Sequence, residues 1–92
     1  MPTYLVETYL ARGRAGERLD RERRASSAAE ELTRENMRVS FERSIHVPED
    51  EICFFVFDAP SGSEAAVVAR QAGLDAIRVV EAVTSAEQSK EE

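Results

Sequence analysis

The chain has 92 residues, a formal net charge of −6 and a single cysteine, Cys53. This length allows one domain, and a lone cysteine excludes an internal disulfide. The acidic balance argues against general binding to nucleic acid or to anionic membranes. The longest apolar run, residues 52–57, is too short to span a bilayer. A lone thiol without an apolar leader predicts a cytoplasmic protein.

The first half of the chain predicts a strand followed by helix. Thr3–Leu10 is rich in aromatic and β-branched residues, which favours a strand. Residues 17–36 contain strong helix formers without Gly or Pro and carry a narrow apolar stripe at helical spacing. Ser26 can act as an internal N-cap, so this stretch forms either one helix or two. Asn36 is suited to a left-handed helix end.

The segment Arg12–Arg24 holds six arginines among three acidic residues. Glu17 with Arg21 and Asp20 with Arg24 are i,i+4 pairs in the favourable order, which is typical of a solvated helix face. The alternative is a docking site for phosphate or for an acidic partner. The sequence favours the solvated face.

The middle of the chain predicts a β-hairpin. Residues 37–47 alternate, with Met37, Val39, Phe41, Ile45 and Val47 expected on one face. Pro48–Asp50 supplies the turn. Glu51–Asp58 is apolar on both faces, as in a central strand that is covered on both sides.

The last third predicts a helix and a final strand. Ser61 and Glu64 form a capping-box pattern that opens a helix ending near Ala72, with Gly73 as its left-handed stop. Residues 76–84 predict the fourth strand. The acidic tail 85–92 is polar and lacks periodicity, which predicts disorder.

This β-α-β-β-α-β order predicts one ferredoxin-like α+β domain over residues 1–84. Its four-stranded antiparallel sheet has strands one and three in the centre, and both helices lie on one face. If Val47 pairs with Ile52 across the turn, His46 lies beside Cys53. This register places Cys53, Phe55 and Phe57 on the face that the helices leave open. Covering such a face contributes several kcal/mol, so the sequence predicts a homodimer packed through the open sheet face, or a different second subunit that covers it.

His46 and Cys53 are the candidate metal ligands, with the acidic residues 49–51 nearby. The alternative is that His46 is a surface residue and Cys53 an apolar filler of the interface, and the sequence favours it. A Cys53 nucleophile activated by His46 lacks a third catalytic group. Acid–base chemistry by Glu7, Tyr9 and Glu42 on the open face has no motif behind it.

One further indication is a likeness over residues 2–84. The run from Arg43 to Ser61, which includes Ser-Ile-His-Val-Pro-Glu-Asp-Glu-Ile-Cys-Phe-Phe, and the Ala72-Gly-Leu end of the second helix carry it. These residues resemble the small bacterial ferredoxin-like domains of unknown function that are often labelled nickel-binding proteins. The resemblance implies a homodimer and Ni(II), or another divalent metal, bound by histidines. Here only His46 can match, with Cys53 as its neighbour.

These observations predict a homodimeric domain without assigned chemistry, with divalent-metal binding as the specific hypothesis. One alternative is a small-molecule-binding or catalytic dimer of the α/β-barrel type. Another is a protein-interaction module that docks an acidic partner through Arg12–Arg24.

Overall fold

We describe residues 1–83 from a computed structural model of the chain. They form four strands and two α-helices in the expected order, with two short 3-10 turns at Arg12–Arg14 and Pro48–Asp50. The strands and helices are β1 (Thr3–Tyr9), α1 (Glu17–Arg34), β2 (Ser40–Val47), β3 (Ile52–Asp58), α2 (Gly62–Gln71) and β4 (Arg78–Ala82). Residues 17–34 thus form one continuous helix. The predicted tail, 85–92, lies outside the described residues.

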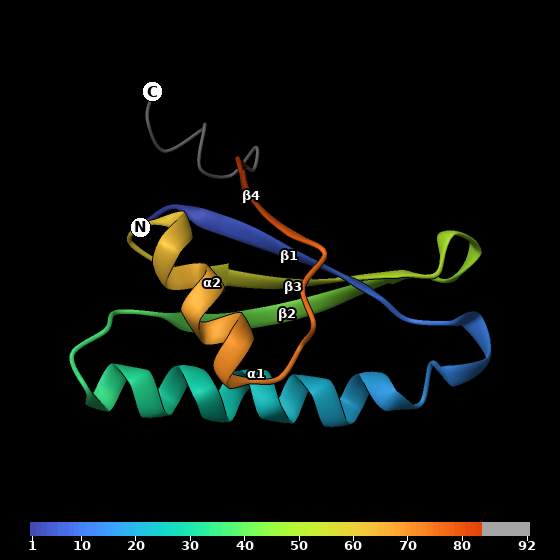
Figure 1. The fold of residues 1–92 in the computed structure, drawn as a ribbon, viewed down its shortest axis with the longest axis horizontal. Helices are drawn as coiled ribbons and strands as arrows, with labels where there is room; N and C mark the ends of the chain where they lie inside the picture. The colour runs from blue at the N-terminus through green and yellow to red at the C-terminus, as the bar shows by residue number, and fades with distance from the viewer. Residues whose placement is uncertain (84–92) are drawn as a thin grey trace.

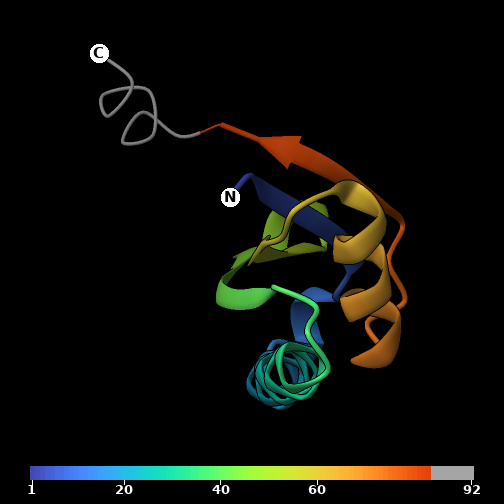
Figure 2. The ribbon, with the colours of Figure 1, turned by 90° about the vertical axis from the view of Figure 1, so that its left-hand side faces the viewer.

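The sheet is antiparallel and has the order β2-β3-β1-β4, so the two central strands are the expected ones. Both helices lie on one side of it, and the opposite side carries no helix (Figure 1, Figure 2). The molecule measures 40 × 32 × 18 Å. The ferredoxin-like α+β prediction is therefore confirmed.

Both helices end in a Schellman motif, in which one residue adopts a left-handed conformation. At the end of α1 this residue is Asn36, with φ 74°, and Met37 N donates to Leu32 O. At the end of α2 it is Gly73, with φ 69°, and Leu74 N donates to Ala69 O. Both predicted stops are confirmed.

The β2–β3 hairpin has the predicted register up to one point. Val47 lies opposite Ile52 and His46 opposite Cys53, but a bulge between Phe41 and Arg43 adds Glu42 as an extra residue. A bulge shifts the alternation by one position. Phe41 therefore packs on the helix side against Phe55 and Phe57, whereas Ile45 points to the other side and is 43% exposed.

The predicted open face is wrong. Cys53, Phe55 and Phe57 are fully buried in the core beneath the helices, together with Tyr4 and Val6 of β1. The physical reason is that helices shelter the bulkier side chains of β3, whereas Ile52, Phe54 and Val56 alternate with them and face the other way. The predicted interface residues therefore do not form a surface.

Candidate functional site

The two predicted metal ligands are neighbours, but they lie on the helix side of the sheet. His46 on β2 is directly opposite Cys53 on β3. The ring Nε2 of His46 lies 3.2 Å from the carbonyl oxygen of Leu10, and Thr8 Oγ1 donates to the carbonyl oxygen of Cys53 at 2.8 Å. The imidazole therefore faces a backbone acceptor, and the thiol is enclosed.

Burial raises the pKa of the Cys53 thiol above its ordinary value. The guanidinium groups of Arg18 and Arg21 offset part of this rise, and Glu22 adds to it. A reactive cysteine needs a lowered pKa and access to its partner. Cys53 has neither, so the arrangement does not favour nucleophilic catalysis at this position.

The donor set of the described chain does not fit a divalent-metal centre. Within residues 1–83, no three His, Cys, Asp or Glu side chains come together in a way that could hold a metal ion. A tetrahedral or octahedral site needs several converging donors, and here one imidazole stands beside one buried thiol. Metal binding through His46 and Cys53 stays a prediction without support from this geometry.

Several arginines of the Arg12–Arg24 segment are bound within the subunit. Arg21 pairs with Glu17 at 3.2 Å and donates to the Tyr9 carbonyl at 2.9 Å. Arg24 pairs with Asp20 at 3.3 Å. The Nη1 atom of Arg24 donates to the carbonyls of Ala72 and Gly73 at the end of α2. These contacts are those of a solvated helix face that also caps a neighbouring helix.

Apolar side chains that the core does not use gather on the side of the sheet that the helices leave bare (Figure 2). The register places seven Leu, Ile, Val and Phe side chains there, and they come from all four strands. They are Leu5 on β1, Ile45 and Val47 on β2, Ile52, Phe54 and Val56 on β3, and Val80 on β4. We call this surface the open face. Except for Val56, these side chains are half-buried or exposed in the single subunit.

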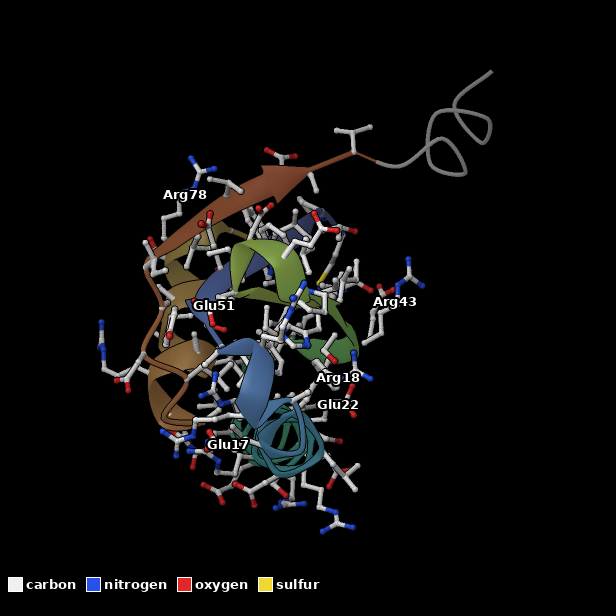
Figure 3. All side chains as sticks on the ribbon, turned by 90° about the vertical axis from the view of Figure 1, so that its right-hand side faces the viewer. Glu17, Arg18, Glu22, Arg43, Glu51 and Arg78 are labelled. Atoms are coloured by element: carbon white, nitrogen blue, oxygen red, sulfur yellow. The ribbon has the colours of Figure 1, made fainter. Side chains whose placement is uncertain are left out.

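Charged groups on the open face are few and nearly balanced. Arg43 and Arg78 lie at opposite edges of the sheet (Figure 3), and Glu7 and Asp58 lie on the central strands. Arg78 Nε donates to Glu7 Oε1 at 2.7 Å, and Asp58 accepts from Thr3 Oγ1 at 3.0 Å. Tyr9, 58% exposed, stands at one end of the face. A mainly apolar surface that carries a few charged groups has the composition of a protein interface.

Sequence reasoning missed the open-face residues because it assumed unbroken alternation through residues 37–47. Arg43 was the available signal, since it interrupts the apolar face at the point where the bulge occurs. Glu7 and Tyr9 do lie on the open face as predicted, and Glu42 is the extra residue of the bulge.

Comparisons with known proteins bear on the fold. No protein-family model matches the chain, and no curated protein matches it. The crystal structure of SCO4226 from Streptomyces coelicolor A3(2) is similar, with a TM-score of 0.66 and 20% sequence identity. The match covers 89% of this chain and 96% of that one. At this identity the likeness shows a shared fold.

Neither helix in residues 1–83 combines the length and the apolar character needed to cross a bilayer.

Proposed function

We propose that this chain is a self-associating domain that pairs with a second copy through its open face. The observation that carries the proposal is a group of apolar side chains drawn from all four strands, Leu5, Ile45, Phe54 and Val80 among them, on a side of the sheet that has no helix over it (Figure 2). Removing apolar area from water contributes about 25 cal/mol per Å². An uncovered sheet face of this kind is therefore a strong candidate for association.

Charge favours a second copy as the occupant. The chain as a whole has a net charge of −6, so two copies repel each other in most orientations. On the open face the two acidic residues Glu7 and Asp58 are offset by Arg43 and Arg78. Two open faces can therefore meet with little repulsion, which directs self-association to this surface.

The size of the face suggests a dimer that dissociates. Strands of seven residues at about 3.3 Å per residue, spaced about 4.8 Å apart, give a flat area of roughly 400 Å². A standard interface takes about 800 Å² of accessible surface from each partner. Side-chain relief increases the accessible area above the flat value, so the open face lies at the lower end of stable interfaces.

The experiment is sedimentation velocity over a concentration series, with Ile45→Asp compared with Leu19→Asp. Both side chains are exposed in the subunit, 43% for Ile45 and 56% for Leu19, so both variants should remain folded. Ile45 lies on the open face, whereas Leu19 lies on α1. We expect wild type and Leu19→Asp to dimerise and Ile45→Asp to weaken the dimer at least about tenfold, the effect of about 1.4 kcal/mol.

A wild type that stays monomeric at every concentration would contradict the proposal. Equal dimerisation of the two aspartate variants would remove the open face as the interface. Circular dichroism spectra of both variants show whether each has kept its fold.

Nickel binding and docking of an acidic partner at Arg12–Arg24 stay predictions from the sequence. The internal pairing of Arg21 and Arg24 reduces the support for the second.

A further inference from the structure

The open face contains a charged pair where an apolar side chain would complete the surface. Glu7 lies on the central strand β1, with Phe54 as its neighbour on β3 and Arg78 as its neighbour on β4. The Arg78 Nε to Glu7 Oε1 distance is 2.7 Å. The Glu7 side chain is 18% exposed, and that of Arg78 is 66% exposed. The carboxylate is therefore set among the apolar residues, while the guanidinium reaches outward.

This pair does little for the single subunit. An ion pair with one largely exposed partner contributes little to stability, because water and salt screen it. The backbone already joins the two segments, since Ile77 N donates to Glu7 O at 2.7 Å and β1 pairs with β4 along its length. Leucine or valine at both positions would suit a strand as well as the charged residues do.

The pair matters once the open face is covered. A charge that enters an apolar interface loses its water, and this is costly unless polar groups of the partner replace it. Arg78 donates to Glu7 through Nε alone in the described structure, and a guanidinium carries five N–H donors. Most of its donors therefore need water or acceptors from the covering molecule.

We infer that Glu7 and Arg78 determine the selectivity of the pairing at the open face. This inference rests on the proposed function. Two copies related by a two-fold axis each bring the same pair, so each copy can supply acceptors and donors to the other. A partner with a wholly apolar face leaves the pair desolvated and unmatched, and it is rejected. Polar residues within apolar helical interfaces select register and partner in the same way, at a cost in affinity.

The test is subunit exchange between wild type and the double variant Glu7→Leu/Arg78→Leu, followed by native mass spectrometry. We expect the variant to dimerise with itself at least as tightly as wild type. We expect mixed dimers at least about twofold below the binomial proportion, because the wild-type pair has no polar counterpart in the variant.

The matched control is Glu31→Leu/Gln71→Leu. Gln71 Nε2 donates to Glu31 Oε1 at 2.8 Å, and this exposed polar pair joins α1 to α2 away from the open face. Its removal should leave mixed dimers at the binomial proportion.

Two failures are distinguishable. If wild type does not dimerise, the proposed function fails, and the selectivity role fails with it. If wild type dimerises and the Glu7→Leu/Arg78→Leu variant exchanges freely into it, the proposed function stands and the selectivity role is overturned.

Discussion

Cys53 lies between His46 and Thr8 in the register, at one end of the buried face of the sheet. Its side chain is fully enclosed, and burial raises the pKa of its thiol. The thiol therefore ionises more readily in the unfolded chain than in the folded one. Its contribution to stability is complete below the pKa of the unfolded thiol and declines as pH rises above that value.

This burial predicts slow labelling of Cys53 by a disulfide-exchange reagent at pH 8. The reagent can reach the sulfur only when the sheet and α1 separate, so labelling depends on that opening. We expect native protein to react at least about a hundredfold more slowly than protein unfolded in guanidinium, which corresponds to an opening free energy of about 2.8 kcal/mol. Fast labelling of native protein near pH 6 would instead indicate an accessible thiolate and revive the catalytic interpretation.

Arg24, a residue of α1, links the two helices by binding the C-terminal end of α2. The Nη1 atom of Arg24 lies 3.2 Å from the carbonyl oxygens of both Ala72 and Gly73. These carbonyls lie at the end of α2, where no further turn of the helix supplies hydrogen-bond donors. A Cβ atom on residue 73 would come within 3.0 Å of that nitrogen. Gly73 is therefore favoured for its positive φ, and a side chain at this position would also displace the guanidinium of Arg24 slightly.

Gly73→Ala should destabilise the protein by about 1–2 kcal/mol, the cost of a left-handed conformation for a residue with a Cβ. The matched control is Gly16→Ala, because Gly16 has φ −63° and a Cβ there meets nothing within 4 Å. That substitution should be neutral or stabilise by up to about 1 kcal/mol. Urea unfolding of both variants measures the difference. Equal stabilities would mean that α2 ends differently in solution.

The β2–β3 hairpin shows how far the sequence could lead. Local signals were sufficient for the order of elements, for both helix ends and for the pairing of His46 with Cys53. The assignment of faces failed because it depended on one inserted residue, Glu42, in a run that otherwise alternates. A bulge is set by packing of the whole sheet against α1, and period-two patterns carry little information about it.

The same limitation applies to the open face. Residues 52–57 are all apolar, so either half of them could face the helices. The choice follows from volume: Phe55 and Phe57 fill the space beside Phe41 and beneath the helices, and Phe54 remains on the open face. This fit between side-chain volumes and the space beneath the helices is a property of the folded structure, and the sequence pattern alone does not show it.

The whole molecule is one sheet with one layer of helices, and its thinnest dimension is 18 Å. A domain of this length buries only about 60–65% of the surface that its unfolded chain exposes. The free energy of unfolding of such a domain is small, and the apolar side chains of the open face remain exposed to solvent in a single subunit. Covering that face with a second copy adds buried area to a fold that has few other ways to obtain it.

Folding and association should therefore be linked. If the dimer is the stable form, the thermal midpoint of unfolding rises with protein concentration by roughly 3–6 °C for each tenfold increase. The rise should cease below the concentration at which the dimer dissociates, and Ile45→Asp should remove it. Differential scanning calorimetry of wild type, Ile45→Asp and Leu19→Asp over a concentration series measures all three effects. A midpoint that is independent of concentration in wild type would mean that the single subunit is stable with its open face uncovered, because mass action makes the midpoint of any dimer depend on concentration.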